Sequence, residues 1–222
     1  MRKTAKSKSK AKRGRPVDMA KRQAMIHAAQ EVFVNKGLEA ANLEEVAAHA
    51  GVSKLTIYNH FGSKDELFVA ALMDKCDSYM KPDAFRTQPV GSTRDGLIQI
   101  GRSFLGLIFD PAALKMHRVV MAESQTHPKI AALFFEKAIM GTAHKVAEFL
   151  SAESKANRLA IRDIAEGTGV YLSMLKGIYH EMAMLNLPMP GRSELYAHIT
   201  RCADLFLKMF APPEKTAKKA KR

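Results

Sequence analysis

The sequence has few cysteines and no long run of apolar residues. Only Cys76 and Cys202 occur among 222 residues, far apart and in mostly apolar, helical patterns. We therefore expect reduced thiols, with neither a disulfide framework nor a metal site. No apolar run approaches the roughly 18 residues that a membrane span needs, and no apolar stretch follows the basic N-terminus as it would in a signal peptide. The expected location is the cytoplasm.

Signatures of β-sheets and of common enzyme classes are also missing. The chain has no Gly-rich phosphate loop, no Gly-x-Ser-x-Gly elbow and no paired carboxylates at plausible strand ends. GTGV at 167–170 lies inside a helical pattern, so we reject it as a nucleotide loop. No alternating run of β-branched residues indicates a strand, and no segment repeats. We expect an all-α protein that is not an enzyme and needs no cofactor.

Acidic residues are absent from the N-terminal end, and this absence locates the net charge of +13. Residues 1–16 carry eight Lys and Arg and no acid, while residues 212–222 carry a net +4, so the middle carries about +1. Both ends have almost no apolar side chains, and we expect disordered basic segments at 1–16 and 211–222. Such segments attract phosphate backbones without reading sequence. For the C-terminal segment, a solubilising or cloning-derived tail is an equally good interpretation.

Between these ends, capping residues and apolar periodicity predict nine helices. Asp18, Asn42, Ser53 and Ser63 are placed to cap four helix N-termini, and Asn42 and Glu45 have the spacing of a capping box. Prolines and a glycine between residues 81 and 92 interrupt the pattern and indicate a boundary. The expected helices cover about 18–36, 42–50, 53–61, 63–80, 93–109, 112–126, 128–151, 163–186 and 193–210.

The short helices 42–50 and 53–61 have the spacing of a helix-turn-helix motif. The turn between them, AGVS, has Gly51 at the bend and Val52 as an inward anchor. On the second helix, Ile57 and Phe61 are one turn apart and should face the core. Amine, hydroxyl, amide and methyl groups then project outward, and these groups suit the base edges of a DNA major groove. The outward side chains are those of Lys54, Leu55, Thr56, Tyr58 and Asn59.

The segment RQAMIHAAQEVFVNKGLEAANLEEVAAHAGVSKLTIYNHFGSKDELFVAAL closely resembles the DNA-binding domain of the TetR family of bacterial transcriptional regulators. Its most specific part, VSKLTIYNHFGSKDEL, follows the family pattern V-S-x-x-[TS]-[LI]-Y-x-[HY]-F-x-[SN]-K-x-x-L in the expected helical context. The resemblance implies a nine-helix architecture. A helix-turn-helix domain would cover 17–72, with its motif at about 42–61, and a ligand-binding and dimerisation domain would cover 73–210.

The resemblance also implies DNA contacts position by position. Lys54, Leu55 and Thr56 occupy base-reading positions, and Tyr58 occupies a position that meets a base edge and a phosphate. The remaining candidates in the motif are Asn42, Ser53, Asn59, His60 and Lys64, of which His60 and Lys64 match phosphate contacts. Arg13 and Arg15 lie in the arm before the first helix, which can follow the backbone or enter the minor groove.

Two features depart from the family pattern. The first helix of the motif opens with Asn42 in place of the usual Thr, and Glu44 stands where some members present a basic or neutral side chain. Residues 17–72 carry a net charge of −2, so attraction to DNA has to come from the recognition surface and the arm. Single residues also have simpler interpretations. His60 suits capping or packing, Tyr58 suits partial burial, and Leu55 suits a single exposed apolar residue of the kind that is normal on protein surfaces.

In the second half, HRVVMAESQTHPKIAALFFEKA resembles the ligand-binding domain of TetR regulators related to controllers of drug efflux. Met and Phe side chains at helical spacing can line an adaptable apolar pocket, although for any single Met a place in the core is commoner. Histidines there can orient a polar ligand atom, but their spacing does not match a metal site. The candidate pocket residues are Phe104, Ile108, His117, Met121, Met140, His144 and Met174.

The last two predicted helices carry apolar stripes that are wider than one internal contact needs. In the resembled family the corresponding helices pair in a four-helix bundle, which implies a homodimer. Alternatively, both stripes are monomer core, since periodicity does not separate the two cases. The candidate interface residues are Val170, Met174, Ile178, Leu195, Ile199, Cys202, Leu205 and Phe206.

These features together predict a homodimeric transcriptional repressor. Its affinity for a palindromic operator in double-stranded DNA would fall when a small apolar or amphipathic molecule binds the second domain, and the helix at 63–80 would couple the two sites. The alternative is an architectural protein that coats DNA through its basic ends and binds no ligand. No cofactor, metal or membrane partner is expected.

Overall fold

The computed structural model describes residues 19–79 and 92–212, and this part of the chain is helical without strands. The all-α prediction is confirmed. The basic arm with Arg13 and Arg15, the cap Asp18, residues 80–91 and most of the basic tail lie outside the described residues. The helices are α1 (Met19–Lys36), α2 (Leu43–His49), α3 (Lys54–Phe61), α4 (Lys64–Tyr79), α5 (Thr93–Ile108), α6 (Pro111–Glu123), α7 (Pro128–Phe134), the π-helical η2 (Phe135–Met140), α8 (Gly141–Lys155), α9 (Ile164–Lys176), α10 (Tyr179–Met184) and α11 (Arg192–Met209).

Three of the predicted N-terminal caps are present. Asn42 and Ser53 accept hydrogen bonds from backbone N–H groups of α2 and α3 at 2.9 and 3.1 Å, and Ser63 does the same for α4 at 3.1 Å. Each bond satisfies a donor that the helix itself leaves unpaired. The capping box is wrong, because the Glu45 carboxylate instead binds Lys36 at 2.7 Å.

Two helices differ from the expectation. Residues 128–155 form one continuous helix whose middle, η2, is π-helical. The helix expected over 163–186 is divided at Gly177, which has φ of 47° and ψ of −149°. Because this left-handed φ suits a glycine and ends α9, α10 is a separate helix and the described part has one helical segment more than expected.

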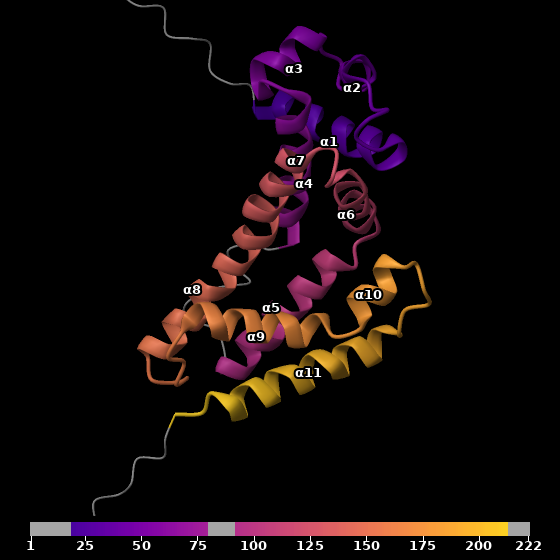
Figure 1. Ribbon diagram of the computed structural model, residues 1–222. Coiled ribbons are helices and arrows are strands. Elements are labelled where there is room, and N and C mark those ends of the chain that lie inside the picture. Colours follow the sequence, from indigo (N-terminus) through magenta and orange to yellow (C-terminus); the bar gives the residue numbers. More distant parts are fainter. Residues whose placement is uncertain (1–18, 80–91, 213–222) are drawn as a thin grey trace, which may run out of the picture.

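The molecule is elongated, and the helices occupy successive positions along its length. Helices α1 to α3 form one end of the molecule, α4 leads away from it, and α9 and α11 lie at the other end (Figure 1). Among the described residues, no single helix is long and apolar enough to span a membrane, although α5 and α6, bent by 62°, meet the criterion as a pair.

Two hydrophobic clusters hold the described part together. The first contains buried side chains of α1 to α4, such as Phe33 and Phe68, whose rings pack edge to face at 5.0 Å. The second is built mainly from α5, α8, α9 and α11. There the buried Tyr171 donates a hydrogen bond to the Leu97 carbonyl at 2.6 Å. Since α4 contributes side chains to both clusters, it connects the two ends through packed core rather than through a flexible linker.

Candidate functional site

The α2–α3 pair is anchored to the first cluster by its inward side chains. Val46 and Ile57 are fully buried, and Phe61 is 8% exposed. Gly51 in the turn has φ of 64°, a conformation that glycine adopts without strain. The helix-turn-helix geometry expected from the spacing is therefore present, and it fixes which face of α3 points outward.

The outward face of α3 carries the side chains predicted to read DNA. Leu55 is 68% exposed and Tyr58 is 43% exposed, while Lys54 and Asn59 are also exposed. Thr56 is half-buried, because its hydroxyl lies 2.8 Å from the Ser53 hydroxyl beside the cap. The exposed Leu55 side chain presents methyl groups on this face, which suits apolar contact with the methyl group of a thymine.

Lys54 is held by an acid from the neighbouring helix. Its ammonium donates to the Glu44 carboxylate at 2.8 Å. The hydrogen bond to Lys54 is the largest cause of a lowered pKa of Glu44, and the same bond raises the pKa of Lys54. Both groups therefore stay charged over the whole neutral range. In this arrangement Lys54 is not free for a base edge, and Glu44 places a negative charge on the exposed side of α2.

The two predicted phosphate contacts occupy different environments. The Lys64 ammonium donates to the backbone carbonyl of Glu39 at 3.0 Å, which ties α4 to the segment after α1. His60 is half-buried and its ring centroid lies 6.2 Å from that of Phe61. Arg22 of α1 lies over the same Phe61 ring at 4.7 Å. A basic group from α1 thus lies close to the end of α3, a contact that α3 alone does not indicate.

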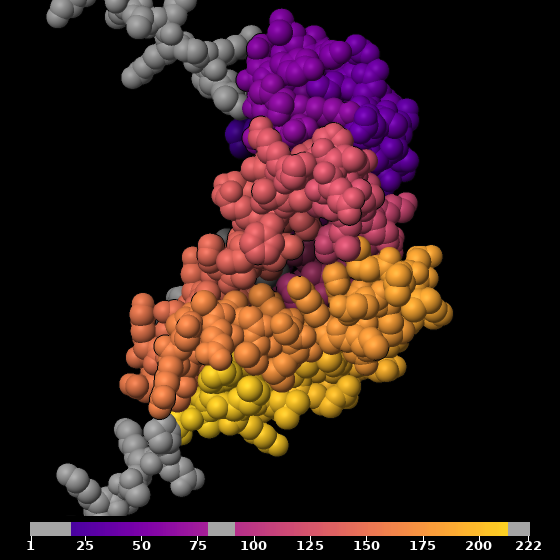
Figure 2. Space-filling model, viewed as in Figure 1, coloured from indigo at the N-terminus to yellow at the C-terminus, as the bar shows by residue number. Residues whose placement is uncertain are grey.

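A cavity of about 130 Å³ opens in the second half of the molecule. Figure 2 shows the hollow between the α6–α8 side and the α9–α10 side, with α5 at its floor. Three of the predicted pocket residues, Phe104, Ile108 and His117, line it. Helix α4 contributes Leu72, Lys75 and Cys76, so the predicted coupling helix reaches the cavity. The remaining lining residues include Leu107, Ala113, Phe134, Ala138, Ile139, Thr142, Ala143, Leu172, Lys176 and His180.

Four predicted pocket residues do not line this cavity. Met121 is 58% exposed and Met140 is 36% exposed, because the helix phase directs both away from the cavity. His144 is exposed, and Met174 packs partly buried against the second cluster. Those four predictions are therefore wrong for this cavity. Sequence reasoning missed Lys176 and His180, which flank the unexpected break at Gly177.

Two histidines and a lysine form the polar part of the cavity wall. The His117 and His180 ring centroids are 5.5 Å apart. Burial, followed by the charges of His180 and Lys176, lowers the pKa of His117 to about 4. Burial and Lys176 also lower the pKa of His180, and the charge of Glu181 opposes this effect. Both imidazoles are neutral at pH 7, and a neutral imidazole can donate one hydrogen bond and accept another.

Helix α6 separates the cavity from the first cluster. Ala113 and His117 on one side of α6 line the cavity, whereas Met116 and Val120, which are 1% and 4% exposed, are buried with the side chains of α1 to α4. Ile130 of α7 joins the same cluster. Packed interiors transmit displacement because they contain little free volume. A ligand that moves α6 therefore also acts on the helices that carry α3.

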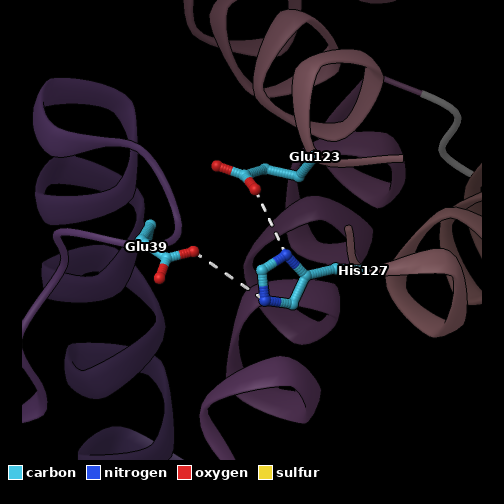
Figure 3. Close-up of side chains that lie close together, drawn as sticks. All are labelled: Glu39, Glu123 and His127. Atoms are coloured by element: carbon cyan, nitrogen blue, oxygen red, sulfur yellow. Dashed lines mark hydrogen bonds and ion pairs between the residues drawn. The ribbon is translucent and has the colours of Figure 1, made fainter. Parts of the chain in front are cut away.

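A second contact between the two halves consists of Glu39, Glu123 and His127 (Figure 3). His127 Nδ1 lies 3.1 Å from Glu123, and Nε2 lies 3.9 Å from Glu39 on the segment after α1. One ligand atom from each of the three residues lies within 4.8 Å of the others, a spacing compatible with a metal ion. Each ring nitrogen already faces a carboxylate, however, so the three side chains form a chain of polar contacts.

The predicted dimer surface is only partly available. Ile199, Cys202 and Phe206 are 5%, 4% and 0% exposed, so one chain already covers them and that part of the prediction is wrong. One face of α11 packs inward on α5 and α9, so the apolar stripe predicted for this helix is wider than the surface that one chain leaves exposed. Ile178 and Leu205 are 70% and 52% exposed. The half-buried members are Val170, Met174 and Leu195.

Comparison with known proteins matches both halves of the chain. Residues 25–71 match the model of bacterial regulatory proteins of the TetR family. Residues 95–212, more than half of the chain, match the C-terminal domain of AefR-like transcriptional repressors. The matched ranges coincide with the helix-turn-helix end and with the part that contains the cavity.

Individual relatives agree with these models. Over 63 residues the chain is 48% identical to the HTH-type transcriptional activator FasR of Mycolicibacterium smegmatis, and this match spans 28% of each protein. A crystal structure of a TetR-family regulator from Mesorhizobium loti has a TM-score of 0.78 at 22% identity, covering 89% of this chain and all of that one. The flavonoid-responsive regulator FrrA has a TM-score of 0.69 at 27% identity, covering 87% of this chain and 98% of FrrA. The chain belongs to the TetR family of helix-turn-helix transcriptional regulators, not to a family of enzymes.

Proposed function

We propose that the protein is a homodimeric repressor that leaves a palindromic operator when a small amphipathic molecule fills the cavity. The observation that carries this proposal is the position of α6, one side of which lines the cavity while the other is buried in the cluster that supports α3. A molecule in the cavity changes the conformational equilibrium only if it prefers the arrangement with mismatched recognition helices.

Reading of the operator is assigned to the outward face of α3. Lys54, Leu55 and Thr56 would meet base edges, with Tyr58 and Asn59 beside them and His60 and Lys64 on phosphates. The ion pair between Glu44 and Lys54, at 2.8 Å, competes with base contact by Lys54. Lys54 has to exchange its carboxylate partner for a base acceptor, so DNA binding includes the opening of this pair.

Two copies are needed because one recognition helix reads only a few base pairs. The exposed apolar side chains on or beside α9 to α11, including Ile178, Leu205 and Met209, support a dimer surface at the end opposite α3. With the dimer surface at one end and α3 at the other, rotation of each chain would change the distance between the two recognition helices. This distance must match the half-site spacing.

We favour a repressor over an activator because of the match found for the half of the chain that contains the cavity. That half matches the AefR-like repressor domain, whereas the short match to the activator FasR covers 28% of the chain. The direction of regulation depends on where the operator lies relative to the promoter. Genome-wide mapping of bound DNA would locate it and identify the neighbouring genes.

Footprinting on genomic and random fragments tests the proposal. A protected palindrome that is released by a small molecule is the expected result. Uniform coating of random DNA would contradict the regulator and favour a DNA-coating protein.

Within the footprint, Lys54→Ala should relax the preference at one base pair per half-site, at a cost of about 1–3 kcal/mol. Lys64→Ala should instead weaken binding to all sequences and lower the salt slope by about 1.

A further inference from the structure

The polar wall of the cavity contains basic and neutral side chains but no acid. Its titratable lining residues are Lys75, His117, Lys176 and His180, together with the thiol of Cys76, and no Asp or Glu of the described residues lines it. The rest of the wall is almost entirely aliphatic or aromatic. A cavity of this composition offers dispersion contacts to an apolar body and positive charge to one polar end.

The two lysines differ in whether their charge is already neutralised. Lys75 lies 3.2 Å from the Asp110 carboxylate, which also accepts a hydrogen bond from Tyr79 at 2.9 Å. Lys176 forms no ion pair with any described residue. Its charge lies close enough to His117 and His180 to disfavour their protonated forms. Lys176 is therefore the cation in the wall whose charge a ligand can balance.

The groups around Lys176 are held in place before any ligand binds. Arg118, next to His117 on α6, donates to the carbonyl oxygens of Met184 and Ala183 at 2.9 and 2.5 Å. These two bonds attach the end of α10, the helix that carries His180, to α6, the helix that carries His117. A site whose donors are already oriented loses less entropy when a ligand binds.

We propose that the effector is an amphipathic anion whose carboxylate binds Lys176 between His117 and His180, with its apolar body among the side chains of α4, α5 and α7. This inference rests on the proposed function and adds the chemical class of the effector. An ammonium head would meet Lys176 as a like charge, and a neutral head would leave its charge unbalanced. The two imidazoles donate hydrogen bonds to the carboxylate oxygens that Lys176 does not occupy.

The test compares head groups on the same apolar body. Hexanoate, octanoate and decanoate are titrated calorimetrically into the full-length protein beside the matching alcohols and amines. Each carboxylate is expected to bind about tenfold more tightly than its alcohol, and the amine most weakly. Lys176→Gln should abolish the preference by lowering the affinity for the carboxylate about tenfold, without lowering the affinity for the alcohol. Retained binding of the alcohol also shows that the variant is folded with an intact cavity.

The matched control is Lys115→Gln, because Lys115 is exposed on α6 and does not line the cavity. This variant should keep the preference of the wild type. Equal affinity for alcohol and carboxylate in the wild type, a preference that survives Lys176→Gln, or no binding by any of the carboxylates would each overturn the proposal. Operator release by a neutral or cationic compound would overturn it as well, yet would leave the proposed ligand-released repressor standing. Failure of all compounds to release the operator would instead contradict the repressor.

Discussion

Glu44 and Lys54 lie ten residues apart in the sequence, yet their side chains meet at 2.8 Å across the turn between α2 and α3. The sequence marked Lys54 as a base reader and Glu44 as a departure from the family pattern, but not that the two are partners. The reason is physical, since helical periodicity places a side chain on a face without fixing its rotamer or its ionic partner.

Removal of the Glu44 charge should therefore strengthen DNA binding. Glu44→Gln frees Lys54 and removes a negative charge from the surface that approaches phosphates, so affinity should rise several-fold for specific and random DNA alike. Fluorescence anisotropy across a salt series measures this, with a steeper salt slope expected. Glu45→Gln is the matched control, because Glu45 lies on the same short helix as Glu44 but is paired with Lys36 of α1. A loss of affinity in Glu44→Gln would show that the carboxylate orients Lys54 for binding.

His117 should make stability depend on pH in a defined window. Its folded-state pKa of about 4 lies below the ordinary 6.5, so between these values the unfolded chain binds a proton that the folded chain does not. The stability gained from the neutral imidazole is complete above pH 6.5 and is lost as the pH falls toward 4. Urea unfolding at pH 7 and at about pH 5 should show a larger loss in the wild type than in His117→Gln. Carboxylates titrate in both proteins, so equal losses would contradict the assignment.

At the scale of elements, capping residues and apolar periodicity were sufficient to predict helices whose ends depend on residues close in the sequence. Ser53 and Ser63 cap the helices that the sequence predicted, because capping depends on neighbours within three residues. The break at Gly177 was missed, since the apolar pattern continues across it and only φ of 47° reveals it. His117 was found as a polar residue on an apolar helix, whereas Lys176 and His180 depended on that break. The position of α6 between cavity and α1 requires contacts between distant segments, which periodicity does not contain.

The contact between Gly96 of α5 and the Phe149 ring of α8 predicts a position where one added methyl group destabilises the fold. A Cβ on Gly96 would lie 2.5 and 2.6 Å from two ring atoms of Phe149, which is 1% exposed and has no room to move. Gly96→Ala should cost about 1–3 kcal/mol of unfolding free energy. Gly141→Ala is the control, because a Cβ there meets nothing within 4 Å and the helical φ suits alanine. It should stabilise the protein by roughly 0.5–1 kcal/mol. Equal effects of the two substitutions in urea unfolding would contradict this account of the packing.

At the scale of the whole molecule, the two ends present different surfaces. The end that carries α3 presents polar and apolar side chains that suit a DNA groove, and the opposite end presents apolar side chains that no part of the described chain covers. Ile178, Leu205 and Met209 are 70%, 52% and 59% exposed. The inward half of each predicted stripe is occupied by monomer core, so only the outward half remains for a second chain.

A charge within this outward half should separate the chains without unfolding them. Leu205→Glu places a carboxylate where the partner surface is expected, and burial of an unpaired charge there costs more than the interface can offset. Lys129→Glu is the control, because Lys129 is exposed on α7 and lies outside α9 to α11. Sedimentation should show a monomer for Leu205→Glu and a dimer for Lys129→Glu and the wild type, with unchanged helical circular dichroism in all three. The monomer should lose operator binding almost completely, because a single α3 spans one half-site and the second half-site no longer contributes to affinity. A monomeric Leu205→Glu variant that still protects a palindrome would show that dimerisation is not required for recognition, and a dimeric one would place the interface elsewhere.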